Sequence, residues 1–594
     1  MQSEPIIDSN LWQSGETKVS PAAAFWRFSP ADNPQLRVGV LLDGLQIPRF
    51  FCKVLEDIRA SNFVHLEMLI FQVPPTPPKR EASNRIARRA RRLADKKLRR
   101  RLLYDAYARL DERTKHSDDP LNLIDCSELL AGVDSIEVRP LGENFIHRFP
   151  DDVIEKIRAK NLDVLLRFGF NILRGDILKT ARYGVWSYHH GDNDYYRGGP
   201  AHFWEIYEKS PLSGVILQVL TEELDAGLVL CKSLFATEPT LYVSRNRYPA
   251  YSGSADFVIR KLNELHQFGW TYLQENAVVP QPYRGKRRIY RTPTNWEMVR
   301  WLGPALIKKI IRYPLRREIV QHWRIGLRTA RQNPLWKTGN LEGFRWLSSA
   351  RGHFWADPFL LVHGGRRWMF FENYSYAQRR AVISCAEISE AGTVNPPTNC
   401  LSAEGHHFSY PYVFQSGSDL YMVPESADSK SVDLYRCEDF PNKWMFVRSL
   451  LKGRFVDSTV WQSKGLWWLM TTSAELDARA GSLLLFFAQS LTGVWSLHRS
   501  SPISNDIRSN RGAGRVFLAE DDRLIRPSQS CCPIYGYSFS LNEITELCPE
   551  RYSERVFRTV KPEFWKDLCG VHTYNIAGDV EVIDGATMTP RSQV

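Results

Sequence analysis

Three self-similar units in the C-terminal half restrict the fold more than any other sequence feature. They are ADPFLLVHGGRRWMFFEN, SYPYVFQSGSDLYMVPES and VDSTVWQSKGLWWLMTTS, and they begin at Ala356, Ser409 and Val456, 53 and 47 residues apart. Each predicts a strand, a glycine-containing turn, an aromatic strand and a polar turn. This spacing is typical of propeller blades of four strands each. Two further segments, RLIRPSQSCCPIYGYSFSLNEI and GVHTYNIAGDVEVIDG, resemble these units more weakly and raise the expected number of blades to about five. We therefore predict an all-β five-bladed propeller over 336–594.

The N-terminal half alternates strand and helix patterns instead. LRVGVLLDG predicts a strand from Leu36, PRFFCKVLEDIRAS a helix and HLEMLIFQV a second strand, and the alternation resumes at SIEVRPL, DDVIEKIRAK and LDVLLRFGF. This order is typical of an α/β domain with a Rossmann-type open sheet, which we expect over 36–278. The first turn holds only Gly44, so the glycine fingerprint of NAD-binding proteins is not present.

Three further segments flank or interrupt this domain. Residues 1–35 show no periodicity, and we expect a flexible arm there. A basic helical insertion is predicted at about 79–115, and a basic linker or bracing helix over 279–335. The default interpretation of both basic segments is a solvated helix. The net charge of +12 also permits an anionic partner, namely membrane headgroups, a nucleotide sugar or RNA. Nucleic acid is the least favoured of these, since no aromatic residues interleave the arginines of the insertion.

Cysteine usage and hydropathy indicate the compartment. No apolar run approaches the roughly 18 residues that cross a bilayer, and the first residues lack the pattern of a signal peptide. The ten cysteines are scattered, without a CxxC pair or a metal-ligand spacing. We expect reduced thiols, no metal site and a cytoplasmic protein.

The residues with the clearest chemical signal lie between Gly184 and Gly227. VWSYH predicts a short buried strand that brings His189 and His190 to its carboxyl end, where open α/β sheets place ligands. GVILQVL predicts a second strand, and the turn TEELDAG after it places Asp225 36 residues beyond His189. A histidine held by a carboxylate can act as a general acid or base and can stabilise an oxyanion. The alternative is a pair of satisfied structural groups.

This stretch resembles the active-site region of the formyltransferase family that uses 10-formyltetrahydrofolate. The family carries an Asn-x-His strand end, a loop ending in Arg-Gly and Pro, Gly-Val strand residues and a Leu-Asp-x-Gly turn. His189, Arg197-Gly198, Gly214-Val215 and Leu224-Asp225-Ala226-Gly227 match that pattern. The resemblance covers about 36–278, and its specific motifs are confined to 184–227.

The resemblance implies a role for each matched residue. His189 would stabilise the tetrahedral oxyanion, and Asp225 would orient His189 and relay protons. Leu224 and, less specifically, the strand-end residues Phe168, Gly169 and Phe170 would help to hold 10-formyltetrahydrofolate, while His190 and Arg197 would contact substrate. The sequence departs from the family at Ser187, where the family has its Asn, and at 191–194, where GDND replaces Ser-Leu-Leu-Pro. Ser187 is then a partial substitute for that Asn in catalysis, because its hydroxyl can donate one hydrogen bond, and Asn193 or His190 can supply the missing donor.

The C-terminal half resembles the five-bladed propellers of glycoside hydrolases acting on arabinans and fructans. It also resembles the propeller part of plant glucosamine inositolphosphorylceramide transferases. Asp357, Glu425 and Asp457 match positions where carboxylates of several blades meet at the central channel, with Arg526 and His572 as channel partners. Glycosidic cleavage needs one protonated and one ionised carboxyl group. Glycan binding and a turn-forming structural role are the alternatives for these residues.

Three functions follow from these patterns. The first is an enzyme that moves a formyl group from 10-formyltetrahydrofolate to an amine on a sugar, nucleotide sugar or glycan precursor, while the propeller holds carbohydrate. The second is a propeller-based glycoside hydrolase or sugar-transferring protein with a degenerate N-terminal domain. The third is a non-catalytic glycan-binding protein.

Overall fold

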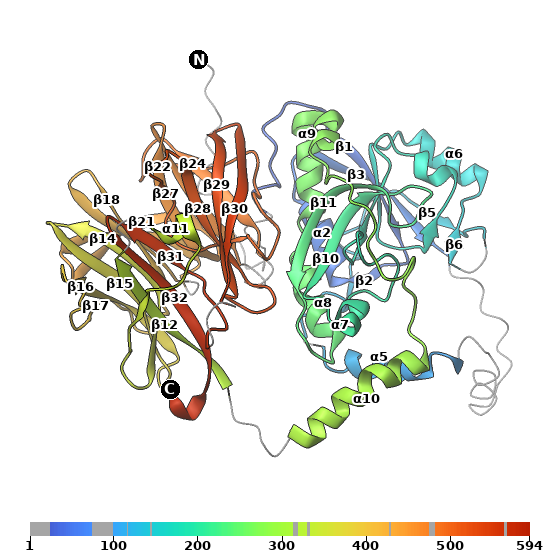
Figure 1. Cartoon of the computed structure of the whole chain (residues 1–594). Helices are drawn as coiled ribbons and strands as arrows, with labels where there is room; N and C mark the ends of the chain where they lie inside the picture. The colour runs from blue at the N-terminus through green and yellow to red at the C-terminus, as the bar shows by residue number, and fades with distance from the viewer. Residues whose placement is uncertain are drawn as a thin grey trace. The chain divides into compact units, whose positions relative to one another are not determined.

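The chain divides into two compact units, Met1–Ile311 and Arg312–Val594 (Figure 1). The structure, a computed structural model, describes residues 24–73, 99–115, 117–142, 145–312, 319–329, 333–426, 429–474, 481–562 and 567–594. The fold class predicted from the sequence is confirmed, since an open, mostly parallel sheet is followed by a propeller of five sheets.

The N-terminal unit is built on a seven-stranded sheet with the order β11-β10-β9-β7-β1-β3-β5. Its strands are β1 (Leu36–Leu42), β3 (Val64–Gln72), β5 (Ser135–Val138), β7 (Val164–Arg167), β9 (Val185–His189), β10 (Leu212–Val219) and β11 (Leu228–Ala236). The first five run parallel. β10 pairs antiparallel with β9, and β11 pairs antiparallel with β10, so β10 is the one reversed strand of this sheet. The chain proceeds from β1 outwards to β5 and then returns to β7 on the other side of β1. This reversal is the switch point at which open sheets bind ligands.

Helices cover both faces of this sheet. Val40, Leu41 and Leu42 of β1 are all fully buried, although successive strand residues point to opposite faces. On one face, α6 (Asp151–Ala159) packs its apolar residues against β1 and β3. The helices α2 (Arg49–Arg59) and α9 (Phe257–Glu275) contact each other and the strands β3 and β11. The apolar strand patterns therefore reflect burial on two sides.

Part of the expected N-terminal arm is packed onto this unit. Asn263 of α9 donates hydrogen bonds to the carbonyls of Trp26 and Phe28, and Arg27 pairs with Asp57 of α2. Trp26 is buried. Residues 24–35 are thus anchored by polar contacts that a search for periodicity does not detect, whereas 1–23 lie outside the described residues.

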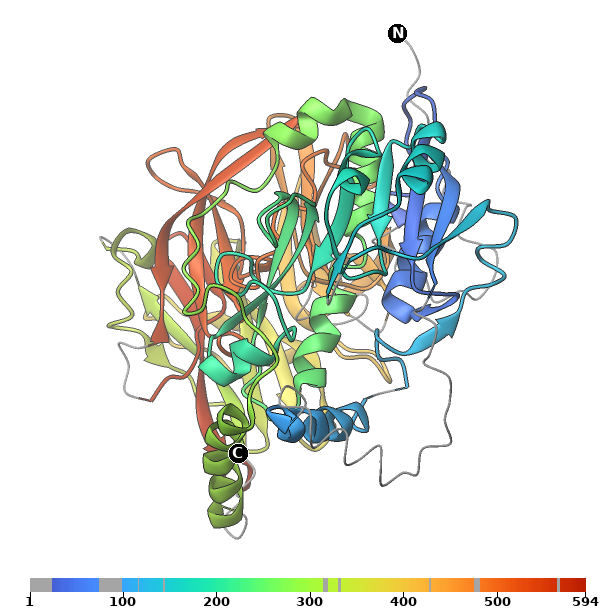
Figure 2. The same cartoon turned by 90° about the vertical axis from the view of Figure 1, so that its right-hand side faces the viewer.

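Two helices begin side by side at one end of the N-terminal unit (Figures 1 and 2). They are α5 (Leu102–Glu112) and α10 (Asn295–Arg312). Asn295 joins them, because its side chain accepts the N–H of Leu103 and donates to the carbonyl of Arg99. Of the expected basic insertion, residues 79–98 lie outside the described part of the chain. No helix in the described ranges is long and apolar enough to span a membrane.

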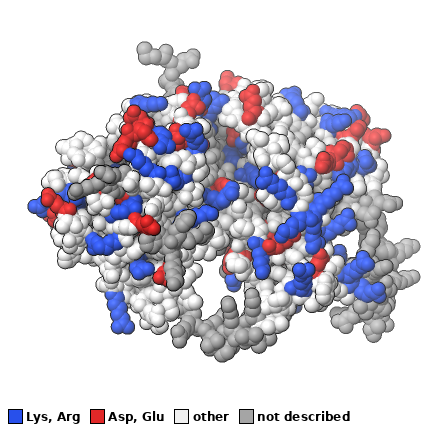
Figure 3. All heavy atoms as spheres, in the orientation of Figure 1, with Lys and Arg blue, Asp and Glu red and all other residues white. Residues whose placement is uncertain are grey.

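Charged side chains of both signs share the face drawn in Figure 3. Lysines and arginines are spread over both units there and alternate with acidic residues. The net charge of +12 is therefore not gathered in one basic patch on this face. Contact of the basic segments with an anionic surface stays a prediction.

The C-terminal unit consists of five sheets, each one blade of the propeller (Figure 1). The first three blades contain β14 (His353–His363) to β17 (Thr398–Leu401), β18 (Ser409–Ser416) to β21 (Lys443–Lys452), and β22 (Phe455–Ser463) to β25 (Ser496–Leu497). The fourth contains β26 (Arg511–Gly512), β27 (Phe517–Leu518), β28 (Leu524–Ser530), β29 (Ser538–Cys548) and β30 (Arg551–Val560). The fifth contains β12 (Ile319–Thr329), β13 (Arg345–Trp346), β31 (Tyr574–Ala577) and β32 (Val580–Pro590).

The ring is closed by strands from the two ends of this unit. β12 pairs antiparallel with β32 along its whole length. The propeller therefore begins before residue 336, the start expected from the sequence, because β12 lies within the segment predicted as linker. Trp323, Ile325 and Leu327 are buried at every second position, which is the strand signal that the surrounding arginines obscured.

Candidate functional sites

The structure brings His189 and Asp225 together at one edge of the N-terminal sheet. His189 is the last residue of β9, and Asp225 lies in the turn between β10 and β11. The Nδ1 atom of His189 is 3.4 Å from Oδ1 of Asp225, and both side chains are about nine-tenths buried. The strand pairing of β9 with β10 produces this approach between two residues that are 36 positions apart.

Backbone and side-chain donors hold the carboxylate of Asp225. Its Oδ2 accepts the N–H of Gly198 at 2.9 Å, and Gln218 of β10 lies 3.4 Å from Oδ1. Asp225 itself has a φ of 53°, in the left-handed region that costs most residues of order 1 kcal/mol. The turn is therefore constrained to keep this carboxylate directed at His189.

The second ring nitrogen of His189 also faces an acceptor. Its Nε2 atom is 2.8 Å from the carbonyl oxygen of Tyr196. Gly191 permits this approach, since a Cβ there would lie 2.8 Å from Nε2. Lys232 of β11 fixes the same loop by pairs of 2.6 Å with Asp192 and Asp194. The GDND sequence thus supplies two carboxylates that anchor the loop over His189.

The hydroxyl group of Ser187 is engaged in other hydrogen bonds than the one expected of it, which was a bond donated to a substrate oxyanion. Its hydroxyl accepts a hydrogen bond of 2.9 Å from Nη1 of Arg167 and donates to the carbonyl of Tyr188 at 3.2 Å. A serine hydroxyl has one hydrogen, so this arrangement leaves Ser187 no proton for an oxyanion. Arg167 is a site residue that the sequence analysis missed, although a charged residue ends the apolar run LDVLLR.

The strand-end residues Phe168, Gly169 and Phe170 lie at the switch point. The N–H groups of Phe168 and Gly169 donate to the carbonyl of Leu41, and the N–H of Phe170 donates to Asp43 at 2.7 Å. The half-buried ring of Phe168 stacks on Phe51 with centroids 4.4 Å apart. The loop is therefore fixed against the end of β1 and presents an aromatic pair at the edge of the sheet.

Among the described residues, no hydrogen bond or ion pair joins the side chains of the other predicted residues to His189 or Asp225. The Arg197 guanidinium lies over the Tyr283 ring and 3.4 Å from Glu223, and its Nε donates to the carbonyl of Asn193. Leu224 is half-buried in the turn beside Asp225. Nothing in these contacts directs the Asn193 amide at His189.

His190 lines a small pocket together with His202, Glu205 and Tyr290. Its ring stacks on Tyr251 at 3.5 Å between centroids. Burial lowers the pKa of His190 well below its usual value and that of His202 to about 3, and burial raises the pKa of Glu205 to about 8. In all three groups burial favours the uncharged form.

In the propeller, the three predicted unit starts share one backbone feature. A bulge interrupts the pairing of β14, β18 and β22 at Asp357, Tyr410 and Asp457, whose φ angles are 48°, 44° and 53°. These strands contact one another in succession, which places them nearest the propeller axis. The weak sequence repeat thus marks a repeated bulge that directs side chains into the channel.

Carboxylates from neighbouring blades accept the N–H groups of these bulges. Oδ2 of Asp584 accepts the N–H of Asp357 at 2.9 Å, and Oε2 of Glu425 accepts that of Asp457 at 2.9 Å. Oδ2 of Asp357 accepts the N–H of Tyr410 at 3.3 Å. The channel carboxylates are therefore part of the contacts between blades.

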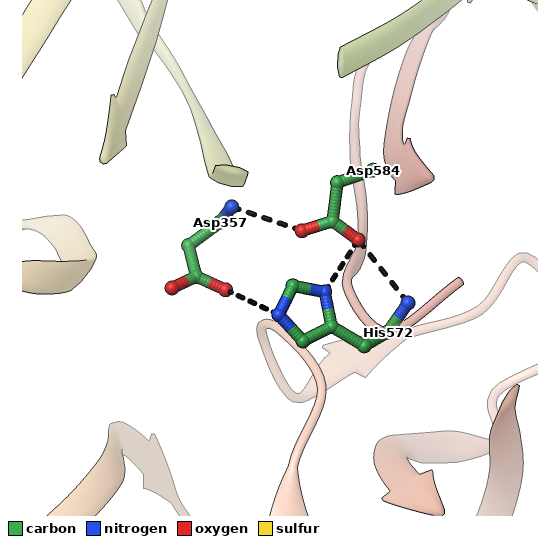
Figure 4. Close-up of side chains that lie close together, drawn as sticks. All are labelled: Asp357, His572 and Asp584. Atoms are coloured by element: carbon green, nitrogen blue, oxygen red, sulfur yellow. Dashed lines mark hydrogen bonds and ion pairs between the residues drawn. The ribbon is translucent and has the colours of Figure 1, made fainter. Parts of the chain in front are cut away.

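His572 lies between the carboxylates of Asp357 and Asp584 (Figure 4). Its Nε2 is 3.5 Å from Asp357 and its Nδ1 is 2.7 Å from Asp584. Burial lowers the pKa of His572, but these carboxylates outweigh burial and raise the pKa above its usual value. One ligand atom of each of the three lies within 4.8 Å of the others, so among the described residues this trio has the spacing of a metal site. An imidazolium between two carboxylates satisfies the same groups without a metal.

Glu425 and Asp457 form the other half of the channel cluster. Asp457 pairs with the buried Arg511 at 2.6 Å. Burial raises the pKa of Glu425, and the nearby carboxylate of Asp457 raises it further. Burial also raises the pKa of Asp357. The site thus combines a carboxyl group that favours its protonated form with an ion-paired carboxylate.

Arg526 is not a channel partner, which corrects the expectation from the sequence. Its Nε and Nη2 atoms donate to Glu554 of β30 at 2.7 and 2.6 Å, so its charge is satisfied within its own blade. Conversely, the sequence analysis missed Asp584, Glu372 and Arg511. Glu372 of β15 (Arg366–Ser375) is buried, and burial and the charge of Asp357 raise its pKa.

Sequence relatives match the propeller unit. The family model described as glucosamine inositolphosphorylceramide transferase 1, N-terminal, matches residues 345–575. The glucosamine inositolphosphorylceramide transferase 1 of Arabidopsis thaliana is 34% identical over 211 residues, which cover 35% of this chain and 28% of that protein. The protein of that name from Oryza sativa subsp. japonica is 33% identical over 206 residues, 34% of this chain and 28% of its own length. The chain thus spans little more than a quarter of the curated relatives it matches.

Solved structures resemble the chain over less than half of its length. Glycinamide ribonucleotide transformylase 1 from Symbiobacterium toebii is 14% identical, with a TM-score of 0.27, and the match covers 43% of this chain and 95% of that one. Zg3597, a family 117 glycoside hydrolase from Zobellia galactanivorans, is 9% identical, with a TM-score of 0.30 and coverages of 46% and 92%.

The raised pKa of Glu425 predicts a pH-dependent stability of the propeller. A carboxyl group whose pKa is higher in the folded than in the unfolded chain stabilises the fold at low pH, and this contribution is lost as the pH rises through the folded-state pKa. We expect the unfolding temperature of the propeller to fall between about pH 5 and 9, and Glu425→Gln to make that fall smaller because glutamine cannot ionise. The measurement is thermal unfolding followed by tryptophan fluorescence.

The control is Glu387→Gln, which removes a partly exposed partner of Arg366 and should follow the wild-type profile. An equally steep fall in Glu425→Gln would show that Glu425 does not control this dependence.

Proposed function

We propose that the N-terminal unit transfers a formyl group from 10-formyltetrahydrofolate, used as a co-substrate, to an amino group on a sugar, nucleotide sugar or glycan precursor. The propeller would bind the carbohydrate part of the acceptor. The observation that carries this proposal is the buried His189–Asp225 pair, 3.4 Å apart, at the edge of the open sheet where ligands bind.

Both ring nitrogens of His189 are directed at oxygen atoms, which suits a donor role. Asp225 holds Nδ1, so that the opposite nitrogen, Nε2, is the one that exchanges partners. In the structure that partner is the carbonyl oxygen of Tyr196. A developing oxyanion is a stronger acceptor than a carbonyl, so we expect substrate oxygen to replace Tyr196 during the reaction.

The residues at the switch point fit the co-substrate. Phe51 and Phe168 are half-buried and stacked there, and such a pair offers apolar surface to a flat heteroaromatic ring. Phe168, Gly169, Phe170 and Leu224 are the residues we propose to hold it. When bound, 10-formyltetrahydrofolate supplies the formyl carbon that the acceptor amine attacks.

The small pocket beside His190 is lined by polar groups that favour their uncharged forms. Its histidines and Glu205 can therefore exchange hydrogen bonds with hydroxyl groups without attracting a charged group. Nδ1 of His190 and Nε2 of His202 are buried without a hydrogen-bond partner in the described structure. These unsatisfied atoms favour a polar group no larger than a water molecule or a single substrate hydroxyl in the pocket.

The matched relatives support an amino sugar as the acceptor. Their name describes a transferase for glucosamine, a sugar that carries a primary amine in its free form. The family match lies in the propeller, where Asp357, Glu425 and Asp457 converge. Carboxylates that line a channel are suited to hydrogen bonds with sugar hydroxyl groups, which is the role we propose for them here.

Calorimetric binding of a stable 10-formyltetrahydrofolate analogue to the full chain tests this proposal. We expect saturable binding, weakened about tenfold or more in His189→Ala and Asp225→Ala, because each variant removes a hydrogen bond to a charged or developing charged group. The control variant is His65→Ala, an exposed histidine of β3, which should bind like the wild type. A folded wild-type chain that shows no binding would exclude formyl transfer from this donor.

Glycosidic cleavage in the propeller is the second candidate function. The observation that favours it is the pairing of Glu425, whose pKa is raised, with Asp457, which is held ion-paired by Arg511. One carboxyl group that favours protonation and another that stays ionised are what glycoside hydrolysis requires.

This alternative predicts release of free sugar from a glycan substrate. Removing a general acid costs about 10²–10⁴-fold in rate, so Glu425→Gln should lower the release by at least that lower limit, while Glu387→Gln leaves it unchanged. The measurement is the appearance of reducing sugar over a panel of oligosaccharides. Binding of sugars without release would instead indicate a non-catalytic glycan-binding propeller.

A further inference from the structure

Arg167 places a positive charge beside the His189–Asp225 pair. It is the last residue of β7 and lies opposite Ser187 in the pairing of β7 with β9. Ser187 and His189 are two residues apart on β9, so their side chains point to the same face of the sheet. Because Nη1 of Arg167 is 2.9 Å from Oγ of Ser187, the guanidinium group also lies on the face that carries His189.

Three hydrogen bonds fix the plane of this guanidinium group. Nη1 donates to Ser187, Nη2 donates to the carbonyl of Phe170 at 2.9 Å, and Nε donates to the carbonyl of Asn171 at 3.1 Å. A guanidinium carries five N–H groups, so these contacts with described residues leave one N–H on each of Nη1 and Nη2. The group is thus held rigidly and retains two donors.

Two carboxylates lie within electrostatic range of Arg167. Burial lowers the pKa of Arg167, while Asp225 and Asp43 act in the opposite direction. A guanidinium stays charged at neutral pH even so. Asp225 therefore pairs with the imidazole of His189 and is within electrostatic range of Arg167, and both residues end neighbouring strands, β7 and β9.

Ser187 cannot serve as the second donor to an oxyanion at this place. Its only hydrogen is directed at the carbonyl of Tyr188, and its lone pair accepts from Arg167. The guanidinium group of Arg167, by contrast, keeps N–H donors on this face that bond none of the described residues.

We propose that Arg167 is a catalytic residue of the formyl-transfer site and stabilises the negative charge that develops on the formyl oxygen. This inference rests on the proposed function. The acceptor nitrogen forms a bond to the formyl carbon, and the electron pair of the C=O bond moves to the oxygen. When that pair returns, the bond from carbon to N10 of the tetrahydrofolate breaks, and the proton lost by the acceptor nitrogen ends on N10. The products are a formamide and tetrahydrofolate.

Substitution of Arg167 should slow the chemical step without weakening donor binding. Loss of one oxyanion donor costs about 10²–10³ in kcat, so we expect Arg167→Met to lose about 100-fold in kcat with KM for the donor within about threefold of the wild type. Arg174→Met is the matched control, since Arg174 is also half-buried and donates to backbone carbonyls, those of Leu173 and Thr221, and it should retain wild-type kcat.

A second substitution separates a catalytic role from a structural one. In Arg167→Met/Ser187→Asn, the asparagine amide supplies an N–H donor near the oxygen that has lost the guanidinium. We expect kcat of this double variant to be about tenfold higher than kcat of Arg167→Met. A merely structural Arg167 would give no such rescue, because asparagine cannot reproduce the bonds to Phe170 and Asn171.

Calorimetry provides a readout that does not depend on turnover. We expect Arg167→Met to bind an analogue with a planar carbonyl as tightly as the wild type, and to lose about 100-fold in affinity for an analogue whose carbonyl is hydrated to a tetrahedral centre. Equal losses of affinity for both analogues, or a kcat of Arg167→Met within about threefold of the wild type, would overturn the catalytic role of Arg167 and leave the proposed function standing. A wild-type chain that binds neither analogue would overturn the proposed function and this inference together.

Discussion

Carboxylates that accept backbone N–H groups from a neighbouring segment fix both candidate sites. Asp225 accepts the N–H of Gly198, and in the propeller Asp584 and Glu425 accept the N–H groups of Asp357 and Asp457. Buried N–H groups need acceptors and buried carboxylates need donors, so each satisfies the other. The same bonds hold residues in left-handed backbone conformations, and those conformations direct functional side chains inward. The geometry of each site is therefore a consequence of how neighbouring segments satisfy their polar groups.

The two units give their titratable groups different electrostatic environments. At the sheet edge, His189 and Arg167 surround Asp225, so the site is suited to stabilising negative charge on a substrate. In the propeller channel, several carboxylates gather around His572 and Arg511, and mutual repulsion together with burial favours protonation of some of them. Such a channel is suited to hydroxyl groups and to cations rather than to anions. This contrast supports the proposal that one unit performs acyl transfer and the other holds sugar.

The sequence could predict the elements of the fold and about half of each site. Periodicity located the strands, and the unit starts at Ala356, Ser409 and Val456 lie directly before the three bulged residues. His189 and Asp225 were predictable because each follows an apolar strand. Asp584 and Arg511 were not, because their approach to Asp357 and Asp457 depends on ring closure between distant strands. The direction of the Ser187 hydroxyl depends on Arg167 and a backbone carbonyl, which no spacing of residues reveals.

The central claim is that the His189–Asp225 site moves a formyl group to an amino sugar. Its most direct test is to incubate the full chain with 10-formyltetrahydrofolate labelled at the formyl carbon and a panel of free and nucleotide-linked amino sugars. Mass spectrometry then follows the label. The account predicts that label enters an amide on at least one amino sugar with the wild-type chain and not with His189→Ala. Label that stays in the folate with every acceptor, while the chain is folded and binds glycans, would contradict it.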